Sequence, residues 1–170
     1  MHETMRGILA ERGFPKTACH PNVISCAPLR YLSSLLGSAV TDPVIDGYLV
    51  QENFGVYDRE VLSRRTMARA LVDARQGAAG QHGYLFCKWT LLTVLMRLDS
   101  TFEGETVNLL HALIHREFSE AWEIGDKLSK SIIEKGFTEP ESALAAMLEI
   151  RSALRLQDSV AIADADGVRR

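Results

Sequence analysis

The sequence predicts an all-α protein, a single-domain helical bundle of about six or seven helices with one buried helix at its centre. Leu and Ala together number 39, against 20 for the β-branched Ile and Val, and this balance favours helices over sheets. Apolar side chains recur three and four residues apart through much of the chain, which is the spacing of one helix face. The length of 170 residues suits one compact domain.

The domain organisation follows from where the apolar pattern ends. Residues 1–157 are assigned to the bundle, and residues 158–170, which are mostly small, to a C-terminal tail. The segment 76–83 contains three glycines and no large apolar side chain. We expect a loop there, because glycine is costly to order. A subdivision of the bundle at this loop is the alternative to a loop within one bundle.

The start of the chain is expected to form one short helix and then a loop. Residues 2–12 have a helical pattern, Gly13 fits the position just after a helix end, and Pro15 prevents continuation. Residues 16–25 are predicted to be a loop, since Pro21 is followed by Asn and the pair is typical of a turn.

Two prolines mark the next two predicted helices. Pro28 suits the first turn of a helix that ends near Gly37. Thr41 and Asp42 then precede Pro43, a combination typical of a new helix start. Because glycine and proline both interrupt helices, we expect two separate short elements here.

An arginine-rich helix is predicted next, from Arg59 to about Arg75, with Asp58 as its N-cap. Arginine recognises phosphate and carboxylate groups through its planar fork, so an RNA-associated module using this helix is one alternative function. Acidic residues partly neutralise the run, and the arginines do not share one face, which favours salt bridges to other helices or to a partner subunit. The candidate partner-binding residues of this helix are Arg64, Arg65 and Arg69.

The segment 84–98 is predicted to be the central helix of the bundle. Only Lys88 and Arg97 are charged in it, and a helix that is apolar nearly all round belongs inside a core. It is too short to span a membrane, which needs about 20 apolar residues.

A long apolar stripe follows in residues 105–135, with members three and four residues apart. One continuous helix of about 30 residues would satisfy this pattern. The alternative is an α-hairpin that turns at Arg116, Glu117 and Phe118, with Ser119 as the second N-cap. The hairpin resembles one unit of a tetratricopeptide-like array, but no second copy appears at a suitable period.

The stripe is the main predicted surface for a partner, since helix stripes of this kind often pack against another subunit. Trp122 lies at its edge, and tryptophan is enriched at binding hot spots. The candidate partner-binding residues of the stripe are Val107, Leu110, Ile114, Phe118, Trp122, Leu128 and Ile132.

The last predicted helix has the clearest start signal in the chain. Thr138 can cap it, Pro140 fits an early helical position, and Glu141 stands three residues after the cap, as a capping box requires. The helix is expected to run to about Leu156.

Metal and catalytic chemistry have little support in the sequence. His111 and His115 stand four apart, so on a helix both face one side and could share a metal; a small metal-dependent helical enzyme is therefore the second alternative function. The residues between them are Ala, Leu and Ile, so the zincin motif is absent, and so are the common phosphate-binding and nucleophile motifs. We expect a non-catalytic protein without a cofactor.

The charge and cysteine content limit the class of partner and the compartment. The net charge of −3 lacks the basic field of a nucleic-acid binder, and three cysteines suit a reducing compartment better than a disulfide framework. With no signal peptide or transmembrane segment recognised, we expect a soluble intracellular protein. The predicted partner is another protein or a second copy of the chain, bound through helix packing, as in an accessory subunit of a larger complex.

Overall fold

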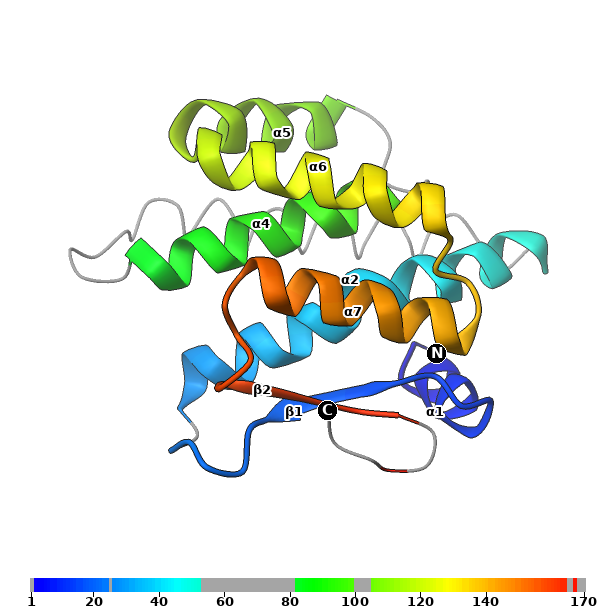
Figure 1. The fold of residues 1–170 in the computed structure, drawn as a ribbon. Helices are drawn as coiled ribbons and strands as arrows, with labels where there is room; N and C mark the ends of the chain where they lie inside the picture. Colours follow the sequence, from blue (N-terminus) through cyan, green and yellow to red (C-terminus); the bar gives the residue numbers. More distant parts are fainter. Residues whose placement is uncertain (1, 25, 53–81, 100–104, 165–166, 168–170) are drawn as a thin grey trace.

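The computed structural model describes residues 2–24, 26–52, 82–99, 105–164 and 167 (Figure 1). These residues form six α-helices and one sheet of two short strands, which confirms the predicted all-α class. In chain order the elements are α1 (His2–Glu11), β1 (Lys16–Cys19), α2 (Ala27–Gln51), α4 (His82–Leu98), α5 (Glu105–Glu117), α6 (Ser119–Lys135), α7 (Pro140–Ala153) and β2 (Val160–Ala163). The predicted arginine-rich helix and most of the glycine-rich segment lie outside the described residues.

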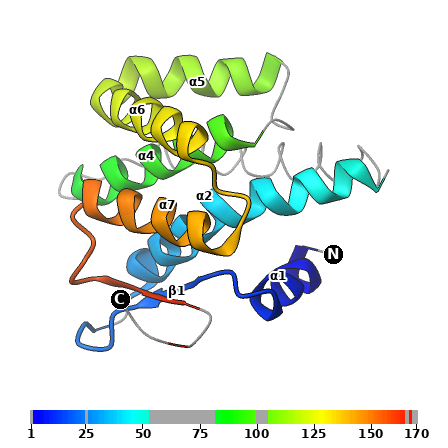
Figure 2. The ribbon, with the colours of Figure 1, turned by 45° about the vertical axis from the view of Figure 1, so that its right-hand side comes forward.

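The helix α4 lies at the centre of the bundle, as the sequence predicts. It packs against α6 on one side and α2 on the other, between the α5–α6 pair and the layer of α2 and α7 (Figures 1 and 2). Trp89, Leu91 and Val94 are fully buried, and even Lys88 is enclosed, with its Nζ 5.5 Å from the ring centre of Tyr31. Despite this apolar character, neither α4 nor any other helix in the described part of the chain has the length and hydropathy needed to cross a membrane.

The prediction of two separate helices around Gly37 and Pro43 is wrong, because α2 runs through both residues without a break. A proline inside a helix removes one backbone hydrogen bond. The neighbouring Val44 and Ile45 are buried in the core, and this packing keeps the helix continuous. Gly37 does not end the helix either. A Cβ at this position would lie 2.7 Å from Thr17 Oγ1, so the glycine allows β1 to approach closely.

Of the two alternatives for the segment 105–135, the structure has the α-hairpin and not one long helix. The helix α5 ends at Glu117 and α6 begins at Ser119. The N-cap is Phe118 and not the predicted Ser119, and it makes no side-chain capping hydrogen bond. The ring of Phe118 instead stacks on Trp89, with ring centroids 5.0 Å apart. Apolar packing against α4 therefore holds the turn in place.

Two strands occupy segments for which the sequence predicts a loop and a tail. They pair antiparallel, with Lys16 opposite Ala163 and Cys19 opposite Val160. β1 packs on α2 and β2 packs on α7 (Figure 2). Val160 and Ile162 are fully buried, so the first residues of the predicted tail belong to the core.

The helix α7 begins one residue later than predicted. Its N-cap is Glu139 and not Thr138, and the third helical residue is Ser142 and not Glu141. The backbone N–H of Glu139 donates to Ser142 Oγ at 3.3 Å, which is one half of a capping box. The motif predicted at the sequence level is present, but its register is shifted by one residue.

Candidate functional site

The predicted partner-binding stripe lies inside the bundle. Five of its residues are at most 7% exposed, and the other two are partly buried against the core. The buried five are Val107, Leu110, Ile114, Leu128 and Ile132, and the partly buried two are Phe118 and Trp122. Because the hairpin folds back, the stripe is used where α5 and α6 pack on each other and on α4. We therefore do not place a partner on it.

The other predicted candidates do not come together in an assembled site. Arg64, Arg65 and Arg69 belong to the 59–75 segment, which lies outside the described residues. Across the described ranges, no three side chains of His, Cys, Asp or Glu gather as a metal ion would require.

The two predicted metal ligands take part in a packed cluster between α4, α5 and α6. The ring of His115 meets the ring of Trp122 edge-on, with centroids 4.8 Å apart. Arg97 Nη2 lies 2.9 Å from Asp126 Oδ1. Burial lowers the pKa of His111 below its usual value, and Arg97 lowers it further while Asp126 acts in the opposite direction. His111 is thus half-buried near the Arg97–Asp126 pair, while His115 is exposed and packs its ring on Trp122.

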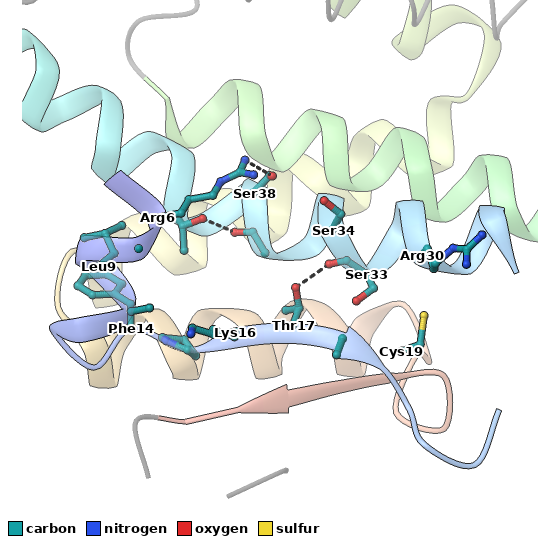
Figure 3. Close-up of a pocket in the computed structure, with 16 residues that line it drawn as sticks. Arg6, Leu9, Phe14, Lys16, Thr17, Cys19, Arg30, Ser33, Ser34 and Ser38 are labelled. Atoms are coloured by element: carbon teal, nitrogen blue, oxygen red, sulfur yellow. Dashed lines mark hydrogen bonds between the residues drawn. The ribbon is translucent and has the colours of Figure 1, made fainter. Parts of the chain in front are cut away.

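An open pocket of about 500 Å³ lies between α1, β1 and α2 (Figure 3). Six consecutive residues, 14–19, line it, together with residues of α1 and one face of α2. Side chains alternate between the two faces of a strand. A pocket that touches every residue of β1 therefore contacts the backbone edge of the strand as well as its faces. We call this pocket the β1 groove.

The end of α1 sets the direction in which β1 leaves the helix. Gly13 has a φ of 89°, which residues with a Cβ rarely adopt. Its N–H donates to the carbonyl of Ala10, and the N–H of Phe14 donates to the carbonyl of Leu9. These are the two bonds of a Schellman motif. Because Phe14 is buried in the core, the chain is anchored directly before the strand begins.

The outer edge of β1 carries backbone groups that β2 does not use. The N–H of His20 donates to the carbonyl of Ser159 at 2.8 Å, in register with the ladder. Hydrogen-bonded pairs alternate along an antiparallel ladder, so Ala18 also bonds to β2 while Thr17 directs its N–H and C=O away from it. Neither backbone group of Thr17 has a hydrogen-bond partner among the residues that the structure describes. Such an edge can accept another strand.

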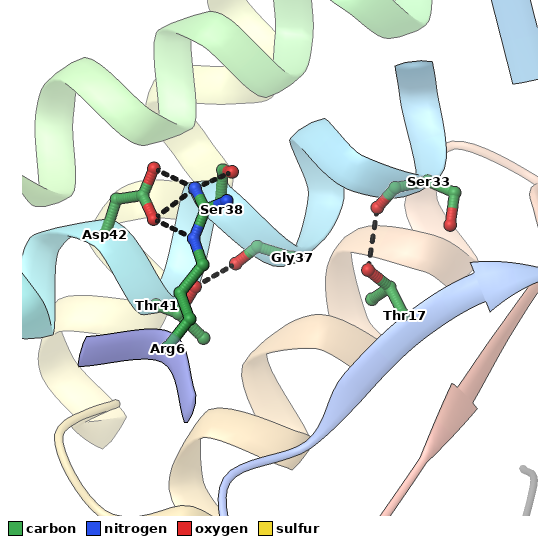
Figure 4. A network of polar contacts seen from close by, with 7 residues as sticks. All are labelled: Arg6, Thr17, Ser33, Gly37, Ser38, Thr41 and Asp42. Atoms are coloured by element: carbon green, nitrogen blue, oxygen red, sulfur yellow. Dashed lines mark hydrogen bonds and ion pairs between the residues drawn. The ribbon is translucent and has the colours of Figure 1, made fainter. Parts of the chain in front are cut away.

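Small residues of α2 form the wall beside β1. Thr17 Oγ1 donates to the carbonyl of Ser33 at 2.8 Å, and Gly37 lies one helical turn further on (Figure 4). Ser34 and Ser38 line the same pocket and are also four residues apart. These residues give α2 a strip of small side chains along the pocket, where β1 approaches the helix closely.

An ion pair joins α1 to α2 at one end of the groove. Arg6 Nη2 lies 2.8 Å from both carboxylate oxygens of Asp42, and it also donates to Ser38 Oγ at 2.8 Å (Figure 4). Charge-assisted bonds of this kind are stronger than neutral ones and restrict geometry. The contact fixes α1 against α2 beside the groove.

The described lining of the β1 groove carries positive charge and no negative charge. Its ionised side chains are Arg6, Lys16 and Arg30, and no Asp or Glu is among the lining residues that the structure describes. Arg6 and Lys16 lie toward α1, whereas Arg30 lies at the opposite end (Figure 3). Since Asp42 neutralises Arg6, the net charge of the groove comes from Lys16 and Arg30.

None of the groove residues was predicted as a site residue from the sequence. β1 has four residues, and its partner strand is far away in the sequence, so local pattern does not reveal it. The available signal lies on α2, where Ser33, Gly37 and Thr41 recur every four residues. Residues four apart share a helix face, and a strip of small side chains there permits close approach of another segment.

Comparisons with protein-family models, with curated proteins and with solved structures find no match to this chain.

Proposed function

We propose that this protein is a non-catalytic interaction module that binds an extended segment of a partner protein in the β1 groove, as an accessory subunit of a larger complex. The observation that carries this proposal is the backbone edge at Thr17, which has no hydrogen-bond partner among the described residues and borders an open pocket. Adding a strand to an exposed sheet edge is a common mode of peptide recognition, in which backbone hydrogen bonds supply affinity.

The dimensions of the groove suit a short extended segment. Pockets that bind ligands are typically about 300–1,000 Å³, and the β1 groove has about 500 Å³. The four residues of β1 extend over about 13 Å, at about 3.3 Å per residue. The small residues on α2 leave room for short side chains on the segment that binds.

The composition of the lining supports binding and not catalysis. The groove offers hydroxyl groups of Ser33, Ser34 and Ser38 and the thiol of Cys19, all of which are nucleophile types. A nucleophile needs a neighbouring general base. No His, Asp or Glu occurs among the lining residues that the structure describes.

Replacing Thr17 with Pro tests the proposed strand edge. Proline has no N–H, and the N–H of Thr17 points away from β2, so the β1–β2 ladder is retained. We expect peptides of about twelve residues, selected from a random displayed library on the unmodified chain, to bind T17P about tenfold or more weakly. This loss corresponds to one unmade backbone hydrogen bond in a desolvated site. Fluorescence anisotropy of the selected peptides measures it.

The matched control is Thr17→Val, which removes the hydroxyl bond to Ser33 but keeps the backbone N–H. We expect T17V to bind the same peptides with an affinity close to that of the unmodified chain. Circular dichroism checks that both variants retain the helical fold. Equal binding by T17P and the unmodified chain, or a library that yields no binder, would overturn the proposal. If light scattering shows a dimer that T17P dissociates, the segment bound in the β1 groove belongs to a second copy of the chain and not to a partner protein.

A further inference from the structure

We infer that the segment bound in the β1 groove is acidic, with carboxylates placed against Lys16 and Arg30. This inference rests on the proposed function and names the chemistry of the partner. It starts from the charge of the lining, where no carboxylate of the described lining residues balances these two side chains.

Of the three cations in the groove, only Arg6 is held in an ion pair among the described residues. Arg6 holds both oxygens of Asp42 and is occupied in fixing α1 to α2. Lys16 and Arg30 are exposed, and no ion pair joins either of them to another residue in the described part of the chain. Two exposed cations therefore line the groove without an ion pair among the described residues, and they can contribute to binding an acidic ligand.

The end of the groove at Arg30 is further favourable to a negative group. Arg30 lies near the start of α2, where the first turn holds no acidic residue and Cys26 makes no side-chain capping bond. A helix N-terminus carries partial positive charge that adds to a neighbouring cation. The protein as a whole has a net charge of −3, so the positive charge of the groove is local. It therefore favours acidic over basic segments through short-range contacts with the bound segment.

The positions of the two cations predict the spacing of the carboxylates. Lys16 is the first residue of β1 and lies toward α1, whereas Arg30 lies beside Cys19 at the other end (Figure 3). A strand that runs along β1 would therefore place its acidic residues roughly three or four positions apart, at about 3.3 Å per residue. Residues between them face the small side chains of α2.

The test uses three labelled peptides of roughly twelve residues built from Thr, Ser and Gln, which differ at two positions spaced to match Lys16 and Arg30. These positions hold Asp, Asn or Lys. By fluorescence anisotropy we expect the Asp peptide to bind roughly tenfold more tightly than the Asn peptide, and this preference to shrink as salt rises. The double variant K16E/R30E is expected to prefer the Lys peptide. The control Lys127→Glu, which changes an exposed cation on α6, should leave the preference unchanged.

The outcomes separate this inference from the proposed function. Equal affinity for the Asp and Asn peptides, lost in T17P, would overturn the acidic partner and leave the strand-edge function standing. The inference would also be overturned if K127E abolished the preference for the Asp peptide as fully as K16E/R30E does. The preference would then come from the overall charge of the protein and not from the groove. If none of the three peptides and no library peptide binds, both proposals fail.

Discussion

Replacing Trp89 with Ala is expected to lower the free energy of unfolding by about 3–5 kcal/mol. Trp89 has 0% of its surface exposed, and its ring stacks on Phe118 at the turn between α5 and α6. Its indole N–H has no hydrogen-bond partner among the described residues, so the substitution removes apolar packing and leaves a cavity at the centre of the bundle. Urea unfolding followed by circular dichroism measures the change.

Trp122 provides the matched control for this substitution. It is partly exposed, and its indole N–H also has no partner within the described ranges, so size and hydrogen bonding are alike in the two variants. Its ring contacts include His115 and the guanidinium of Arg97, at the edge of the bundle. We expect Trp122→Ala to cost about 1–2 kcal/mol. Equal losses from the two substitutions would contradict the central position of α4.

Replacing Gly125 with Ala is expected to lower the free energy of unfolding by about 1–3 kcal/mol, because it overpacks the contact between α4 and α6. An added Cβ would lie 2.7 Å from the Cβ of Thr93 and 3.0 Å from the carbonyl oxygen of Thr90. Backbone atoms of α4 cannot move aside as a flexible side chain can. The two helices must separate, and the loss of their packing outweighs the higher helix propensity of alanine.

Gly47 is the control for helix propensity. It lies inside α2, and beyond its own helix backbone no described atom stands within 4 Å of a Cβ added there. Gly47→Ala is therefore expected to raise the free energy of unfolding by up to about 1 kcal/mol. Chemical denaturation of both variants measures the change in the free energy of unfolding. We expect this change to be negative for Gly125→Ala and positive for Gly47→Ala. A gain in stability for Gly125→Ala would show that α4 and α6 do not approach as closely as described.

The helical part of the fold follows from local sequence pattern. The near-continuous apolar character of α4 predicts its central place, and the three-and-four spacing predicts the stripe that α5 and α6 bury. The choice between a long helix and a hairpin depends on Phe118, whose ring packs on Trp89 from a distant segment. The spacing of apolar residues does not predict that contact, because the long helix and the hairpin both place the apolar stripe on one helix face.

The two strands and the continuity of α2 depend on contacts between distant residues. β1 has four residues and pairs with a segment more than one hundred positions away, so neither strand has a partner that local pattern can identify. Gly37 and Pro43 are signals that normally end a helix. In α2 they are overridden by the buried residues around Pro43 and by the close approach of Thr17 to Gly37.

The candidate site is the part of the molecule that the sequence predicts least. Sequence reasoning assigns partner binding to apolar stripe residues, and the structure uses them as core. The groove instead combines Thr17, Lys16 and Arg30, which come from a strand and a helix that the sequence does not place together. The arginine-rich 59–75 segment lies outside the described residues, so its predicted role as a binding helix stays a prediction.

The most direct test of the strand edge is the amide hydrogen exchange of Thr17, measured by NMR without and with a saturating selected peptide. We predict that the Thr17 amide exchanges readily in the free chain and is slowed roughly tenfold or more when the peptide binds. The amide of Ala18 already bonds to β2 and is expected to change little. Unchanged exchange at Thr17 in the presence of a bound peptide would contradict the β1 groove as the binding site.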